Sequence, residues 1–274
     1  MNNSLSAEIF KKFNVKVLGE GIQPMMFAHG YGCDQNMWRF VYPHFEKQYK
    51  IILFDYIGGG KSDIDSYSKE KYSSLQAYAD DVISICTGLN LTNVIFVGHS
   101  VSAMIGVLAS NKKPSLFSHL IMIGPSPRYI NDSEYIGGFE NEAIEELMEA
   151  LDSNYLGWSA SMAPVIMGNS DRPELGDELT NSFCQTDPEV AKNFARVTFL
   201  SDNREDLQNV ITPTLVLQCS QDVIAPVVVG DYVAKNIKNS EYKLLNATGH
   251  CPNLSAPEET VSAIQEYLQK KEHV

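Results

Sequence analysis

The run from residue 94 to 106 constrains the fold more than any other part of the chain. Four apolar residues, Val94 to Val97, are followed by Gly98 and His99, and the chain then enters a stretch rich in small side chains. An apolar run of this length is typical of a buried strand, and small residues let the next helix pack closely on a sheet. Ser100 therefore stands at a sharp strand-to-helix corner. Such a corner exposes the hydroxyl at the helix N-terminus and makes it a candidate nucleophile.

Two observations favour a different interpretation of Ser100. Catalytic corners follow the pattern Gly-x-Ser-x-Gly, and the second glycine is replaced here by Ser102. Serine is also a favoured residue at the start of a helix, where its hydroxyl caps the backbone. The run alone leaves nucleophile and helix cap open. The choice depends on whether the chain supplies a base and a group to orient that base.

Two later loops supply these partners. Asp222 follows an apolar strand expected at residues 214–219, and His250 follows a strand expected at residues 242–245. The order Ser, Asp, His, with each residue just after a strand, is the α/β-hydrolase order. We therefore predict that Ser100 attacks the substrate, His250 transfers the proton and Asp222 holds the imidazole.

A glycine-rich loop after a strand expected at residues 25–28 adds a further part. Tyr31 lies in this loop between Gly30 and Gly32. In this fold such a loop supplies one backbone N–H to the negative charge that develops on the attacked carbonyl oxygen. We predict the N–H of Tyr31 as this donor and the N–H of Val101, directly after the nucleophile, as the second.

With these residues in view, the chain resembles the RsbQ subfamily of α/β-hydrolases, bacterial regulators of the general stress response. It is also similar to the plant strigolactone and karrikin receptors, which resemble it at Ser102 as well. The resemblance implies an α/β-hydrolase fold with a mainly parallel eight-stranded sheet and a four-helix lid. It also implies a partner, a PAS-domain-containing serine phosphatase of the energy-stress (sigma-B) branch. The stretches that carry it are 29–35, 53–56, 98–106, 124–128, 137–140, 201–207 and 249–252.

The order of expected elements agrees with one α/β core interrupted by a helical insertion. Up to residue 128 expected strands alternate with helices, which is typical of a parallel sheet covered on both faces. From 129 to 203 the strand signals stop, and strands resume after Pro213. Residues 1–128 and 204–274 are thus expected to form the core, and 129–203 a lid over the C-terminal ends of the strands. The expected lid helices span 140–151, 154–167, 173–185 and 188–200.

Apolar side chains of the lid predict a closed pocket for a small hydrophobic ester or lactone. Trp158 and Met162 are four positions apart and share one helix face. The alternative is that these side chains form only the core of the lid. The candidate pocket residues are Tyr129, Phe139, Trp158, Met162, Phe194 and Val197.

A formal net charge of −13 argues against binding to nucleic acid or to an anionic membrane, because phosphate would be repelled. The charge is concentrated between Arg128 and Arg172, where the chain has several carboxylates and no Lys or Arg. This stretch is either a solvated helix face or a surface for a basic partner.

Other sequence features indicate the cellular compartment and the absence of bound groups that we expect. No apolar run approaches the ~20 residues needed to span a bilayer, and no signal peptide is visible. The five cysteines are scattered without metal-ligand spacing. They predict free thiols in a reducing cytoplasm, and neither a metal nor a cofactor is expected.

The run from Gly58 to Ser62 resembles the end of a phosphate-binding loop. That loop requires a glycine five positions before Gly60, where the chain has Asp55. A nucleotide site is therefore excluded.

Two functions remain open. One is a metabolic carboxylesterase or lactonase, and the other is a signalling protein that uses the same residues, which the resemblance favours.

Overall fold

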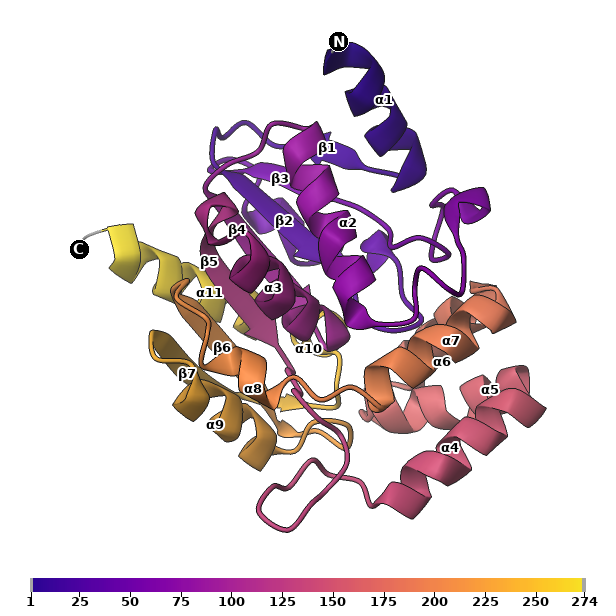
Figure 1. Ribbon diagram of the computed structural model, residues 1–274. Coiled ribbons are helices and arrows are strands. Elements are labelled where there is room, and N and C mark those ends of the chain that lie inside the picture. Colours follow the sequence, from indigo (N-terminus) through magenta and orange to yellow (C-terminus); the bar gives the residue numbers. More distant parts are fainter. Residues whose placement is uncertain (1, 273–274) are drawn as a thin grey trace.

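The computed structural model describes residues 2–272 and shows a seven-stranded sheet between helices, with four more helices gathered at one end (Figure 1). The strand order is β1-β3-β2-β4-β5-β6-β7, and all neighbours are parallel except β1 and β3. Parallel neighbours require crossover connections, which the helices provide. The strands are β1 (Lys16–Leu18), β2 (Pro24–Ala28), β3 (Lys50–Leu53), β4 (Val94–His99), β5 (Phe117–Ile123), β6 (Thr214–Gln221) and β7 (Ser240–Thr248).

The expected α/β-hydrolase fold is confirmed, but the expectation of eight strands is wrong for the described residues, which form seven. The residues before β1 form helix α1 (Asn2–Lys12) rather than a further strand. Ile9 of α1 is buried against Gly88 of the neighbouring helix, where even a Cβ would meet it at 2.7 Å. β1 is therefore the edge strand on this side of the sheet.

Alternate residues of the central strands face opposite layers, as strand geometry requires. Met26 and Ala28 of β2 pack in one hydrophobic cluster, and Met25 and Phe27 pack in the other. The first cluster includes helices α2 (Leu75–Gly88), α3 (Val101–Lys112) and α9 (Val227–Asn236), and the second includes α11 (Pro257–Glu272). Short helices α8 (Arg204–Leu207) and α10 (Pro252–Ser255) complete the core.

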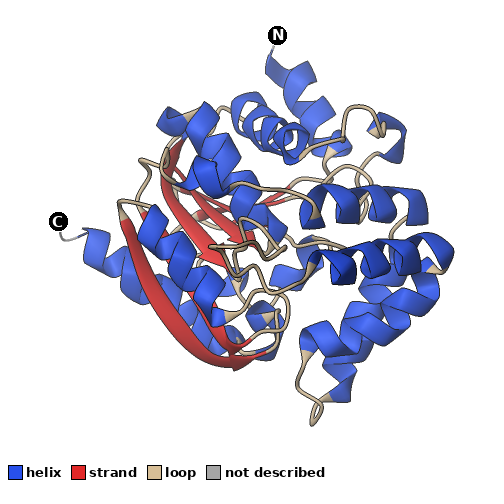
Figure 2. Ribbon diagram, turned by 60° about the horizontal axis from the view of Figure 1, so that its bottom comes forward, coloured by secondary structure: helices blue, strands red, loops and turns tan. Residues whose placement is uncertain are grey.

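The four helices expected between β5 and β6 are present and lie together beside the sheet, to the right of the strands in Figure 2. Side-chain caps begin two of them. Asn154 accepts a hydrogen bond from the Gly157 N–H at 3.0 Å, and Asp187 accepts from Glu189 and Val190. The lid helices are α4 (Asn141–Ser153), α5 (Tyr155–Met167), α6 (Pro173–Gln185) and α7 (Pro188–Phe199).

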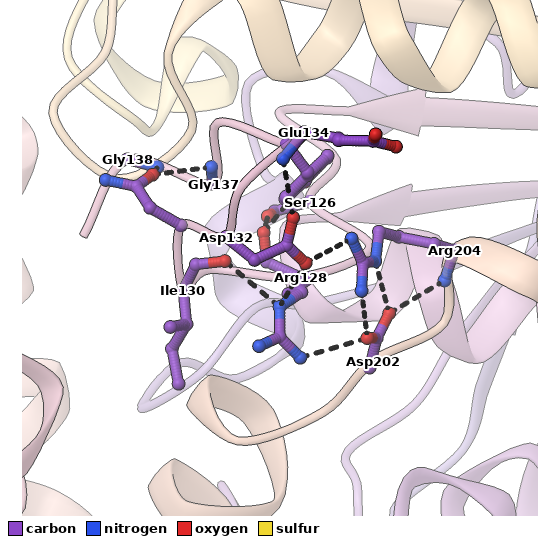
Figure 3. Close-up of polar contacts among 11 residues, drawn as sticks. Ser126, Arg128, Ile130, Asp132, Glu134, Gly137, Gly138, Asp202 and Arg204 are labelled. Carbon is purple, nitrogen blue, oxygen red and sulfur yellow. Dashed lines mark hydrogen bonds and ion pairs between the residues drawn. The ribbon is translucent and has the colours of Figure 1, made fainter. Parts of the chain in front are cut away.

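The two chain segments that connect the lid to the core are joined to each other (Figure 3). Arg128, before the lid, pairs with Asp202, after it, at 2.9 Å. Arg204 contacts both Asp202 at 2.7 Å and Asp132 at 2.6 Å. The N–H of Asn203 donates to the carbonyl of Pro127 at 2.7 Å. The hydrogen bonds and charge of Arg204 outweigh burial and lower the pKa of Asp202, so this carboxylate stays ionised. We call these four charged residues the lid base.

Three further observations concern the described part of the chain. No helix there is long and apolar enough to cross a membrane. No cluster of three or more His, Cys, Asp or Glu side chains is arranged to hold a metal ion. The five cysteines are unpaired, and Cys184 alone among them is exposed.

Candidate active site

Ser100 occupies the corner between β4 and α3 in a strained conformation. Its φ of 58° and ψ of −125° lie outside the regions that side chains ordinarily adopt. The turn is held by the Ser100 N–H, which donates to the carbonyl of Ile123 at 2.8 Å. A Cβ at Gly98 would stand 2.6 Å from the carbonyl oxygen of Ser102, so the corner requires glycine there. Strain of this kind, retained in a buried corner, indicates a functional residue.

Ser102 fits the position where the pattern has glycine because its hydroxyl is paired on both sides. It donates to the carbonyl of His29 and lies 2.9 Å from the hydroxyl of Tyr56. The side chain is fully buried. The substitution therefore ties the corner to the end of β2, a role that the sequence pattern did not suggest.

The structure brings the three predicted polar residues into one chain of hydrogen bonds. The Nε2 atom of His250 lies 2.8 Å from Oγ of Ser100, and Nδ1 lies 2.7 Å from Oδ2 of Asp222. The other carboxylate oxygen of Asp222 accepts the N–H groups of Ile224 and Ala225 at 2.8 and 3.0 Å. An ionised Asp222 makes Nδ1 the protonated nitrogen, so Nε2 is left free to accept the serine proton.

The Asp222 carboxylate is buried, yet its pKa lies below its usual value. Burial raises the pKa, but the contact with His250 and the two backbone N–H groups together lower it by more than burial raises it. The carboxylate therefore stays ionised across the neutral range, although water does not reach it.

The loop after β2 lies directly against Ser100. A Cβ at Gly30 would stand 2.8 Å from Nδ1 of His99 and 3.3 Å from Cβ of Ser100, so only glycine permits this approach. The backbone N–H of Tyr31, in the same loop, has no acceptor among the described residues. Val101 is the first residue of α3, where N–H groups lack helical partners. Both predicted oxyanion donors are thus near the nucleophile and free to donate.

His99, the residue directly before the nucleophile, is hydrogen-bonded to the backbone of His250. Its Nε2 lies 2.7 Å from the carbonyl oxygen of His250. Burial, together with the nearby His250, lowers the pKa of His99 to about 3, so the ring is neutral and donates one proton to that carbonyl. His99 therefore holds the backbone of His250 in place. Its position directly before Ser100 in the sequence is the signal that points to this role.

Ser100 and His250 open into a mostly apolar cavity between the strand ends and the lid. Its volume is only ≈ 30 Å³. About two waters fill such a space, so a substrate has to be small or has to displace side chains of the wall. The cavity is lined by Tyr31, Cys33, His99, Ser100, Tyr129, Ile166, Leu179, Phe183, Thr198, Phe199, Ile224, His250 and Cys251.

The two cysteines of the wall do not compete with Ser100 as nucleophiles. Burial raises the pKa of the Cys33 and Cys251 thiols far above the ordinary value. A thiol that remains protonated is a poor nucleophile. These side chains act as small apolar wall elements.

Of the six predicted pocket residues, Tyr129 lines the cavity and the other five lie elsewhere. Trp158 stacks behind Phe183 at 5.9 Å, and Phe194 stacks on Tyr78 at 4.5 Å. Val197 faces a separate surface depression. Met162 and Phe139 are partly buried in the hydrophobic cluster of the lid and core.

These predictions failed because α5 and α7 each reach the cavity with only one turn. Helix α5 reaches it only with its last turn, at Ile166, four positions beyond Met162 on the same face. Helix α7 likewise contributes Thr198 and Phe199 from its end rather than Phe194. Periodicity predicts which face of a helix is apolar, but not which turn of that face meets a ligand.

Comparisons with known proteins agree with this arrangement. The sequence profile described as "Alpha/beta hydrolase family" matches residues 25–263. A karrikin insensitive 2 receptor of Petunia hybrida is 38% identical over 93% of this chain and 95% of its own. The strigolactone esterase of Arabidopsis thaliana is 36% identical over 96% of this chain and 98% of its own. A solved structure of a hydrolase from Oleispira antarctica superimposes with a TM-score of 0.94 at 44% identity, covering 96% of this chain and 97% of that one.

Proposed function

The chain belongs to the alpha/beta hydrolase family, and from this premise we propose that it hydrolyses small esters or lactones with Ser100 as nucleophile. The observation that carries the proposal is the hydrogen-bonded chain from Ser100 through His250 to Asp222, at 2.8 and 2.7 Å, in the wall of a mostly apolar cavity. A serine, a base and a group that orients the base are the requirements for acyl transfer through a covalent intermediate.

The reaction proceeds in two halves. Nε2 of His250 takes the proton as Oγ of Ser100 attacks the carbonyl carbon, and the carbonyl oxygen becomes negative. The N–H groups of Tyr31 and Val101 stabilise this charge. The protonated imidazole gives its proton to the leaving alkoxide, and the acyl group remains on Ser100. Water then attacks the acyl enzyme with His250 again as base, which releases the acid and restores the hydroxyl.

A small, largely apolar ligand is favoured by the cavity. Aromatic and aliphatic side chains form most of its wall, and Lys, Arg, Asp and Glu are missing from the residues that line it. A charged metabolite would lose its hydration there without a compensating partner. The similar plant proteins are named for karrikin and strigolactone, and for this chain we propose a small hydrophobic ester or lactone.

Acyl transfer is tested by incubating the protein with para-nitrophenyl acetate and measuring both released nitrophenol and intact protein mass after an acid quench. We expect a burst of nitrophenol and a protein carrying one acetyl group, because nitrophenolate leaves readily and acylation of Ser100 is then faster than hydrolysis of the acyl enzyme. Heat-unfolded protein is the control. Slow, burst-free release at the rate of the unfolded control, with no adduct, contradicts the proposal.

A second proposal concerns signalling. We infer that this hydrolase acts in the cytoplasm in the general stress response and activates a PAS-domain-containing serine phosphatase, as the RsbQ resemblance implies. The observation that favours a partner is the surface of α4. Glu142, Glu145, Glu146 and Glu149 are exposed there, while Ile144 and its neighbours on the other face are buried. A row of like charges at the rim of an interface steers association with a basic partner.

Replacing Glu142, Glu145 and Glu149 with glutamine tests this surface. We expect slower association with the phosphatase and a weaker stress response, with esterase rates close to those of the wild type, because exposed charges contribute little to stability. Association is measured by surface plasmon resonance with the phosphatase from the same organism. A matched control replaces Glu8, Glu20 and Glu258, which are exposed outside the lid, and has the same change in charge. Equal association rates for the two triple variants rule out α4 as the docking surface.

A further inference from the structure

Two hydroxyl groups in the wall of the cavity lack a hydrogen bond of ordinary distance and angle within the protein. The Oη atom of Tyr31, which has the phenol of Tyr155 nearby, and the Oγ1 atom of Thr198 are buried without such a bond, and both residues line the cavity. Their side chains belong to residues that are 8% and 2% exposed. Buried polar groups are normally paired, because an unpaired one loses its hydration without compensation. Each such group in a native structure calls for a partner.

Thr198 lacks the bond that a threonine in a helix usually makes. Threonine hydroxyls within helices commonly donate to the carbonyl four residues earlier. Thr87 does so to Ile83 at 2.8 Å, and Thr180 does so to Gly176 at 2.9 Å. Thr198 lies in α7, but its hydroxyl makes no bond to the corresponding carbonyl of Phe194. Its hydroxyl is therefore free to meet a group inside the cavity.

Tyr31 presents its hydroxyl in an aromatic environment. Its ring lies 5.4 Å from Phe183, on one side of the cavity, and 6.4 Å from Phe199, on the other. The nearby Tyr155 hydroxyl donates to the carbonyl of Phe183 at 2.8 Å. Burial, and then the proximity of Tyr155, raise the pKa of Tyr31 well above its ordinary value, so the phenol is neutral and can donate.

These two groups differ from the other unpartnered polar atoms of the described chain. Trp38, Tyr78 and Tyr267 also carry such atoms, but they lie in the packed core and do not line the cavity. Tyr31 and Thr198 are also distinct from Ser100 and His250, which pair with each other. The cavity thus offers a second polar location besides its catalytic one.

We propose that the hydroxyls of Tyr31 and Thr198 form a subsite for a second oxygen of the substrate, separate from the carbonyl that Ser100 attacks. The fitting group is a neutral acceptor such as an ether, a lactone ring oxygen or a second carbonyl. This inference rests on the proposed ester hydrolysis and narrows its substrate class. A site built to hydrogen-bond a substrate oxygen discriminates against the analogue that lacks it, because the buried hydroxyls then stay unpaired.

The test uses pairs of esters that differ only by exchange of one CH₂ for oxygen. Para-nitrophenyl methoxyacetate and butyrate place the change in the acyl group, and methoxyethyl acetate and butyl acetate place it in the alcohol. The preference is the ratio of kcat/KM for the ether to that for its hydrocarbon analogue. We expect Thr198→Val and Tyr31→Phe each to lower this ratio about threefold to tenfold in at least one pair, mainly through KM for the ether.

Thr180→Val is the matched control, because it removes a helix threonine of the lid whose hydroxyl is already bonded to Gly176. It should leave both ratios at the wild-type value. Ratios that stay at the wild-type value in Thr198→Val and Tyr31→Phe as well overturn the proposal, and the hydroxyls then pair with trapped water only.

Binding separates this inference from the proposed hydrolysis. The Ser100→Ala protein is titrated with each ester, and the rise in Tm is recorded with and without Thr198→Val. A larger rise in Tm with the ether, lost on Thr198→Val, supports the subsite. It does so even if the wild type cleaves none of the esters, and that lack of cleavage would contradict only the proposed hydrolysis. Equal rises for ether and hydrocarbon, unaffected by Thr198→Val, overturn the subsite independently of turnover.

Discussion

Replacing Ser100 with alanine should lower kcat/KM for short esters by on the order of 10⁴ to 10⁶ while leaving Tm close to that of the wild type. The hydroxyl is hydrogen-bonded to Nε2 of His250, and the corner itself is held by the backbone bond from Ser100 to Ile123. Alanine keeps that backbone bond and the same Cβ. Chemistry is lost because no other nucleophile is available, as the thiols of the cavity wall are protonated.

The measurement combines steady-state kinetics with intact mass after exposure to para-nitrophenyl acetate. The variant should show neither burst nor acetyl adduct. Ser84→Ala, at an exposed position of α2 where the hydroxyl bonds only to its own helix, is the control and should retain the wild-type rate. If the Ser100 variant still forms an adduct at the wild-type rate, the nucleophile lies elsewhere.

Replacing Asp222 with asparagine should lower kcat by about 10³ to 10⁴ with the fold intact. The Oδ1 atom accepts the N–H groups of Ile224 and Ala225, and an amide oxygen can keep both bonds. The amide nitrogen then points at Nδ1 of His250 and donates to it. The imidazole must respond by carrying its proton on Nε2, where it can no longer accept the proton of Ser100.

This prediction is checked by kinetics together with circular dichroism, because a loss of fold would also lower the rate. Asp231→Asn is the matched control. Asp231 is partly exposed on α9 and pairs with Lys235 one turn away, so its loss should leave kcat within about twofold. A folded Asp222 variant with near-wild-type kcat would mean that His250 is oriented by another group.

The arrangement of the three polar residues could be predicted because it depends on local patterns. Ser100, Asp222 and His250 each follow a run of apolar residues, and the carboxyl ends of parallel strands meet at one edge of a sheet. Three residues placed after three such strands come together without further information. The lid helices were predictable for a similar reason, since proline, asparagine and aspartate mark their first residues.

The cavity wall could not be predicted in the same way. Which turn of α5 or α7 faces the ligand depends on the tilt and height of the lid above the sheet, which are set by contacts between distant segments. The pairing of Ser102 with His29 and Tyr56 is also tertiary, so the sequence showed only a missing glycine. The count of eight strands came from the family resemblance rather than from apolar runs in this chain, and the described residues form seven strands.

The lid base has a consequence for how proteins of this shape diversify. The segments on either side of the lid lie side by side, joined by Arg128, Asp202 and the bond from Asn203 to Pro127. An insertion whose two ends already meet places no demand on the length or register of the strands beneath it. Mutations, and even wholesale exchange of α4–α7, can then change what enters the cavity while the machinery at the strand ends is inherited unaltered. The part of the cavity wall that the lid supplies is thus free to evolve at a different rate from the residues at the strand ends.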